Sequence, residues 1–122
     1  MSNFAQILTL PEFVADGSLS VVDNVLPFEI KRVFWIYDSD GFERGKHRHK
    51  KTKQALIALS GEIMIYMDNG VEQKDILLNK RNECLIVEPE DWHTMKFYNK
   101  GVLLVLASEA YNKDDYMAEK YK

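Results

Sequence analysis

Residues 62–79, EIMIYMDNGVEQKDILLN, contain the pattern of two strands joined by a tight turn. Residues 62–67 alternate with a period of two, which is typical of a strand with one buried face. Asp68, Asn69 and Gly70 follow, and Asn and Gly accept the positive φ that a hairpin turn requires. Residues 71–79 form the returning strand. We therefore predict an antiparallel hairpin at the centre of the chain.

The same short-strand pattern extends outward in both directions from this hairpin. Each further segment is rich in β-branched, aromatic or aliphatic residues and ends at Gly, Pro or Asn, as in antiparallel sandwiches and barrels. A turn is expected at 99–101, and a short surface helix over 112–122, capped by Asn112 or Asp114. The expected strands are 29–38, 54–61, 62–70, 71–79, 83–89, 93–99 and 101–108.

Length and composition indicate one globular domain over residues 1–122. The chain is 46% hydrophobic and 29% charged, with a formal net charge of −3, so we expect neither a nucleic-acid partner nor an anionic membrane. No run approaches the roughly 18 apolar residues of a membrane span, and the N-terminal MSNFAQILTLPEF lacks the features of a signal peptide. The single cysteine, Cys84, fits a reducing compartment. We expect a cytoplasmic protein.

The three histidines of the chain carry the strongest chemical signal. His47 and His49 lie in RGKHRHKKTKQ, residues 44–54, and two residues apart on a strand they point to the same face. Arg48 and Lys50 then point to the other face. His93 follows a separate apolar strand and a proline turn. In a small barrel, all three imidazoles can line one cavity.

The spacing around the first two histidines resembles the first motif of the cupin family. Gly41, five residues, His47-x-His49, four residues, Gln54, six residues and Gly61 match that motif in order. Gln54 stands where cupins usually carry an acidic metal ligand, and a neutral amide is a poorer ligand for a divalent cation.

The second cupin motif is matched less closely. Pro89 and His93 are similar to its Pro and His, but Asp91 replaces the Gly and the spacing is one residue shorter. Cationic neighbours Arg44, Lys46 and Arg48 would also oppose a dication if they point inward. A metal-free use of the histidines is therefore favoured over a three-histidine metal site.

A closer resemblance covers nearly the whole chain. The chain is similar to the dTDP-4-oxo-6-deoxy-glucose 3,4-ketoisomerases, small WxcM-like cupins, with Arg48 and Trp35-Ile36-Tyr37 as variants of the family pattern. The resemblance implies a jelly-roll β-barrel, no metal or other cofactor, and a role in making 3-amino-3,6-dideoxy sugars for bacterial surface glycans. It also implies a homodimer that exchanges N-terminal strands. The blocks that carry it are LPFEIKRVFWIYD, RGKHRHKKTKQALIALSG, DNG, WHTM and VLLVLASEAYNKDDY.

The implied reaction moves a ketone from C4 to C3 of the sugar through an enediol. It needs a base near pH 7, an acid, and donors for the developing oxyanion. Histidine suits the first two tasks, because its unperturbed pKa is about 6.5. We expect His47 to remove the C3 proton and His49 to return or shuttle protons, with Tyr37 as a hydroxyl donor.

Five further residues are candidates for binding the substrate. Arg32 and Arg44 suit the pyrophosphate, because a guanidinium can bind two oxygens. Trp92 could pack on the sugar or the thymine, and Gln54 could bond a sugar hydroxyl or hold a histidine. His93 could orient or stabilise the enediolate.

Two other functions stay open on the residues alone. One is a metal-dependent cupin, such as a dioxygenase that uses the three histidines. The other is a non-catalytic cupin that binds a sugar nucleotide without changing it. For the isomerase, the sequence leaves the gluco and galacto products equally open.

Overall fold

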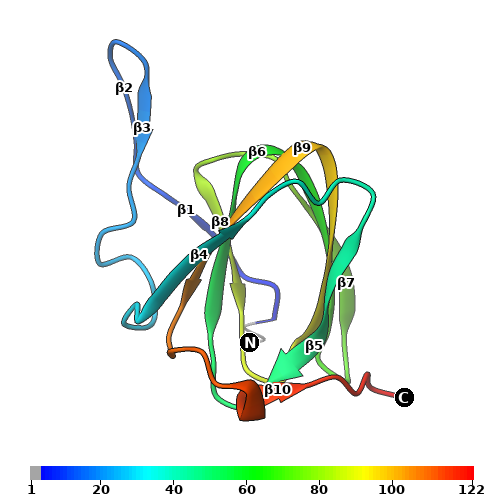
Figure 1. Cartoon of the computed structure of the whole chain (residues 1–122). Coiled ribbons are helices and arrows are strands. Elements are labelled where there is room, and N and C mark those ends of the chain that lie inside the picture. The colour runs from blue at the N-terminus through cyan, green and yellow to red at the C-terminus, as the bar shows by residue number, and fades with distance from the viewer. Residues whose placement is uncertain (1–3) are drawn as a thin grey trace.

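Two long antiparallel strands, β6 (Gln54–Asp68) and β9 (Trp92–Ala107), form the centre of the fold in the computed structural model, which describes residues 4–122. Six shorter strands complete a curved sheet around this pair (Figure 1). Strands β7 and β8 pair with β6, β4 and β5 pair with β9, β1 extends β8, and β10 extends β5. Their bounds are β1 Ile7–Thr9, β4 Arg32–Ile36, β5 Glu43–His49, β7 Gln73–Leu78, β8 Glu83–Val87 and β10 Tyr116–Met117.

The predicted hairpin is present, with β6 paired to β7 from Ile63 opposite Leu78 to Asp68 opposite Gln73. The all-β jelly-roll class expected from the sequence is confirmed. Along β6, inward and outward residues are both buried over 54–58, because residues of the N-terminal segment cover the outer face there. This double burial explains why the sequence is continuously apolar at that point.

The predicted strand ends at 61–62 and 99–101 are wrong. The expected strands 54–61 and 62–70 form one bent strand, and so do 93–99 and 101–108. The register of β6 against β9 shifts between Ala58 and Glu62, where Gly61 has a φ of 64°. Opposite it, Asn99 and Lys100 have φ values of 56° and 59°. The carboxylate of Asp40 accepts hydrogen bonds from the backbone N–H groups of Lys100 and Gly101 and holds this bend.

The predicted C-terminal helix is also wrong in its length. Asn112 caps it as expected, with its side-chain oxygen accepting a hydrogen bond from the Asp114 N–H. The helix is a single 3₁₀ turn, η1 (Lys113–Asp115), because the chain then continues into β10 and pairs with β5.

Two groups of buried apolar residues flank the sheet. The larger group fills the barrel interior and includes Ile63, Met67, Phe97 and Leu103. The smaller group covers the outer face and includes Cys84, which is buried and free; burial raises the pKa of its thiol to about 12. Cys84 is thus a buried apolar-like side chain. Within residues 4–122, no helix is long and apolar enough to span a membrane.

A separate hairpin projects from the barrel near the N-terminus. Strands β2 (Glu12–Val14) and β3 (Ser18–Ser20) pair only with each other and stand away from the rest of the molecule (Figure 1). Phe13, Val14 and Leu19 on this hairpin are 62%, 74% and 57% exposed. Such a run of exposed apolar residues is typical of a surface that another chain covers.

Gly61→Ala should destabilise the protein more than Gly41→Ala. Both glycines have positive φ, but a Cβ at Gly61 would lie 2.6 Å from the carbonyl oxygens of Tyr98 and Asn99, whereas one at Gly41 meets nothing within 4 Å. We expect Gly61→Ala to cost at least about 2 kcal/mol more in urea unfolding, because backbone atoms must move. Equal losses in the two variants would show that the close approach of the strands is not limiting.

Candidate active site

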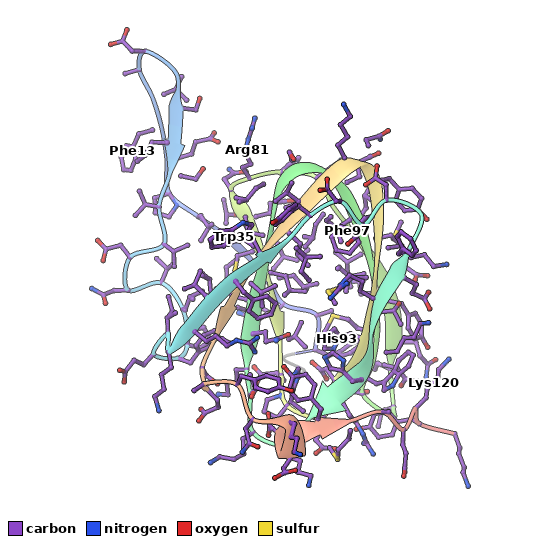
Figure 2. All side chains as sticks on the ribbon, viewed as in Figure 1. Phe13, Trp35, Arg81, His93, Phe97 and Lys120 are labelled. Carbon is purple, nitrogen blue, oxygen red and sulfur yellow. The ribbon has the colours of Figure 1, made fainter. Side chains whose placement is uncertain are left out.

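The three histidines meet inside the barrel, near η1 and β10. Figure 2 shows His93 in the interior near these elements. His47 on β5 lies opposite His93 on β9, and their ring centroids are 5.1 Å apart. His49 shares the inward face of β5, with its ring centroid 4.9 Å from His47 and 6.0 Å from His93. The prediction that His47 and His49 point to one face is therefore confirmed, as is their meeting with His93.

A β-bulge in β5 shapes this part of the site. Gly45 and Lys46 have φ values of 85° and 62°, and the register against β9 shifts between Gly45 and His47. The extra residue places Arg44 on the same cavity as His47, although a regular strand would point them to opposite faces. A Cβ at position 45 would lie 2.9 Å from the His93 carbonyl oxygen, so only glycine fits.

The hydrogen bonds of two rings fix which nitrogen carries the proton. Nδ1 of His47 lies 3.0 Å from the Gly45 carbonyl oxygen, and Nδ1 of His93 lies 2.9 Å from that of Asp91. A carbonyl can only accept, so each Nδ1 donates, and Nε2 of the neutral ring keeps its lone pair. Among residues 4–122, Nε2 of His93 and both ring nitrogens of His49 are buried and have no hydrogen-bond partner.

Burial keeps all three imidazoles neutral near pH 7. Loss of hydration lowers the pKa of His49 to about 4, with further lowering by His47 and Arg32 against a smaller opposing effect of Asp115. Burial lowers the pKa of His93 to about 3 and also lowers the pKa of His47, in each case against the backbone hydrogen bond to Nδ1. A neutral His47 with a free Nε2 is the form that accepts a proton.

A cavity of about 440 Å³ opens in front of His47 and His93. It receives most of the residues that the sequence predicted for the site: Tyr37, Arg32, Arg44 and Gln54 line it together with these two histidines. His49 lies behind this wall and is 1% exposed. The wall is therefore basic and polar on one side, with apolar residues Phe34, Ile36, Met95 and Val105 filling the rest.

Trp92 is not brought to this cavity. It precedes His93 on β9, so its indole points to the opposite face, where it lies 6.1 Å from Tyr66 between ring centroids. Its Nε1 donates a hydrogen bond of 3.1 Å to the Ala118 carbonyl. This side chain fixes the C-terminal segment to the outside of the barrel.

The sequence did not point to Tyr116, which lines the cavity from β10. Its ring contacts His47 and His49, with centroids 4.9 Å and 4.7 Å away. The polar composition of 112–122 predicted a surface helix and concealed this residue. The block VLLVLASEAYNKDDY did include it, but only as part of a resemblance.

The donor set does not suit a metal of the usual cupin kind. Gln54 supplies no charge, and the guanidinium of Arg32 faces the same cavity. Within residues 4–122, no three His, Cys, Asp or Glu side chains are arranged to hold a metal ion together. We therefore assign no step of the reaction to a metal.

The comparisons with known proteins agree with this geometry. The model of the family described as WxcM-like, C-terminal, matches residues 3–122. The chain belongs to this family. The TDP-4-oxo-6-deoxy-α-D-glucose 3,4-oxoisomerase of Aneurinibacillus thermoaerophilus is 39% identical over 107 residues, which are 84% of this chain and 77% of that protein.

Solved structures of ketoisomerases superpose closely on this WxcM-like chain. The TDP-quinovose 3,4-ketoisomerase of Campylobacter jejuni is 37% identical, with a TM-score of 0.91 over 97% of this chain and 95% of that one. A mutant 3,4-ketoisomerase of Thermoanaerobacterium thermosaccharolyticum, solved with TDP-4-keto-6-deoxyglucose, is 34% identical, with a TM-score of 0.89 over 98% and 90% of the two chains. The resemblance seen in the sequence is confirmed.

The protein should lose stability as the pH falls from about 6.5 to 4. The unfolded chain protonates His49 and His93 near pH 6.5, whereas the folded chain keeps them neutral to about pH 4 and 3. Each histidine therefore lowers the free energy of unfolding by up to about 1.4 kcal/mol for each pH unit in this window. Urea unfolding at several pH values, with NMR titration of the rings, measures both quantities.

Asp91 provides an internal control for this pH dependence. Burial raises the pKa of its carboxyl to about 6, despite a hydrogen bond from the Glu88 N–H, so the folded chain takes up this proton first and gains stability in acid. Asp91→Asn removes that gain, so the loss of stability on acidification should become steeper below pH 6. Histidine rings that titrate near pH 6.5 in the folded protein would contradict the prediction.

Proposed function

We propose that the chain is a metal-independent sugar-nucleotide 3,4-ketoisomerase that acts on dTDP-4-oxo-6-deoxy-glucose. The observation that carries the proposal is the pair His47 and His49, neutral and in ring contact, with His47 on the wall of a cavity that Arg32 and Arg44 also line, in a chain of the WxcM-like family. The relatives named above act on, or bind, sugars of this class. The product enters the synthesis of 3-amino-3,6-dideoxy sugars.

The first step is removal of the C3 proton by His47. This proton is acidified by the adjacent C4 carbonyl, and its removal gives an enediolate across C3 and C4. Nε2 of His47 has the free lone pair and faces the cavity, whereas His49 lies behind it. This arrangement favours His47 over His49 as the base.

The second step returns a proton to C4, and the proton of the C3 hydroxyl moves to the C4 oxygen, so that the carbonyl and the hydroxyl exchange places. The protonated His47 can give its proton to C4. His49 is in ring contact with His47, but its ring nitrogens have no hydrogen-bond partner among residues 4–122, so no direct hydrogen bond joins the two rings. Tyr37 and His93 lie on the same cavity wall. The Tyr37 hydroxyl can donate a hydrogen bond to the enediolate oxygen, whereas Nε2 of neutral His93 can only accept one, from a sugar hydroxyl. Product configuration at C4 depends on the face that receives this proton.

The nucleotide is held by the cationic part of the wall. Arg32 and Arg44 lie on β4 and β5 at the cavity and can bind the pyrophosphate, as guanidinium groups do. Gln54 is buried at the base of the cavity, where its amide suits a sugar hydroxyl. Trp92 has no part in this scheme, because its ring is on the other face of β9.

His47→Asn should abolish turnover and leave nucleotide binding almost unchanged. Loss of a positioned acid–base group costs about 10²- to 10⁴-fold in rate. The measurement is an NMR time course of dTDP-4-oxo-6-deoxy-glucose in D2O with EDTA-treated protein, which follows deuterium entry and the 3-oxo product; dTDP binding is measured by calorimetry. His49→Asn and wild type are run in parallel.

The outcomes separate this proposal from its rivals. Exchange that needs added metal would indicate a metal-dependent cupin. Tight dTDP binding by wild-type protein, with no exchange and no new sugar, would indicate a binding protein without this activity. A His47→Asn variant that turns over normally would remove that residue from the role of base.

We infer further that two chains associate through the β2–β3 hairpin, exchanging N-terminal strands. The support is the hairpin itself, which carries exposed Phe13, Val14 and Leu19 and pairs with no other strand among residues 4–122. A second copy is the occupant that the family resemblance implies.

Phe13→Glu combined with Leu19→Glu should convert the dimer to a monomer, because two carboxylates would enter an apolar interface. Light scattering after gel filtration measures the mass. Val71→Glu is the matched control, because Val71 is 85% exposed on the turn after β6. A wild-type monomer, or a charged double variant that stays dimeric, would contradict the role of the hairpin.

A further inference from the structure

Tyr116 occupies a central place among the groups that carry the chemistry. Strand β10 pairs with β5 so that Tyr116 lies directly opposite His49 in the backbone register. Its ring meets the edges of the His47 and His49 rings at interplanar angles of 66° and 65°. Its hydroxyl accepts a hydrogen bond of 3.4 Å from Nη1 of Arg32. One side chain therefore contacts both proposed acid–base groups and one proposed phosphate-binding group.

The chain just before Tyr116 is firmly attached to the barrel. The buried carboxylate of Asp115 accepts hydrogen bonds from the Lys51 and Thr52 N–H groups and from the Thr52 hydroxyl. Burial raises the pKa of this carboxyl, but these hydrogen bonds together lower it below its usual range, so the group is ionised at neutral pH. The Lys50 N–H also donates to the Asp115 carbonyl.

The chain just after Tyr116 is attached to the outside of the barrel. The Ala118 carbonyl accepts the hydrogen bond of the Trp92 indole. The Tyr121 hydroxyl donates to the Glu90 carbonyl at 2.7 Å, and the guanidinium of Arg48 lies 4.3 Å from the Tyr121 ring centre. Two anchors on either side of a two-residue strand leave Tyr116 little freedom to move away from the histidines.

The surroundings of the histidine pair show what this ring contributes. His93 faces the pair from β9, Arg32 from β4, and Asp115 from η1, and each of these groups is polar or charged. The Tyr116 ring adds a large apolar surface in contact with both rings of the pair. Loss of hydration is the main reason why the pKa values of His47 and His49 are low.

We propose that Tyr116 is a positioning residue of the active site. Its ring orients His47 and His49 and excludes water from them, and its hydroxyl holds Arg32 against the cavity wall. The inference rests on the proposed ketoisomerase function for its kinetic part only, because the orientation and hydration of the histidines can be measured without substrate.

The test compares Tyr116→Phe with Tyr116→Ala, because the first removes only the hydroxyl and the second also removes the ring. In Tyr116→Ala, water reaches the imidazoles, so the pKa of His47 and His49 should rise toward 6.5 in an NMR titration of the free protein. If the pKa of His47 reaches 6.5, about three quarters of the base is protonated at pH 6, so protonation alone should lower kcat about fourfold at pH 6 and hardly at all at pH 8.

Tyr116→Phe should behave differently. The ring stays, so the histidine titration and kcat should match wild type, while KM rises by about threefold as Arg32 loses its acceptor. Tyr98→Ala is the control for loss of a tyrosine, because Tyr98 is exposed on β9 away from the cavity. Thermal unfolding of each variant confirms that the barrel is intact.

Two results would overturn the inference. One is a Tyr116→Ala protein, folded at the test temperature, with an unchanged histidine titration. The other is a Tyr116→Phe protein with the same titration change as Tyr116→Ala, which would assign the effect to the hydroxyl. A wild-type protein without ketoisomerase activity would refute the proposed function, and the titrations would still decide the role of the ring.

Discussion

The antiparallel pairing of β6 with β9 is the constraint on which the rest of the molecule depends. At one end β9 lies between β6 and β4, and at the other end between β6 and β5. The change of neighbour requires the bend at Gly61, where backbone atoms approach too closely for any side chain. Because His93 lies in β9 opposite both Met67 and His47, the same pairing fixes the third histidine in the interior.

Burial gives this interior its chemistry. An imidazole on the surface would be partly protonated near pH 6.5, but these three are shielded from water and stay neutral. Two backbone carbonyls then fix the tautomers of His47 and His93. The protein thus obtains a base and a hydrogen-bonding wall from backbone geometry and exclusion of water.

Much of this architecture could be predicted from local sequence patterns. A period of two located β4 and the strands β6 to β9, and the His-x-His spacing placed two rings on one face. The strands β1, β2, β3, β5 and β10 lie outside the expected strands. The sequence predicts strand ends at Gly61 and at 99–101, where the structure has bends within strands. Gly and Asn indicate positive φ, and this occurs in bulges as well as in turns. The place of Tyr116 depends on the long-range pairing of β10 with β5, which no short pattern encodes, whereas the orientation of Trp92 follows from its position next to His93 on β9.

The position of β9 along the chain also determines when the site can form during synthesis. Residues 92–107 emerge from the ribosome after β4, β5 and β6, which all need β9 as their neighbour. Until then the apolar side chains of β6 lack their main partner strand, and such exposed strands favour aggregation. Strand β10 emerges later still, so the histidines become enclosed only after residues 116–117 have been made.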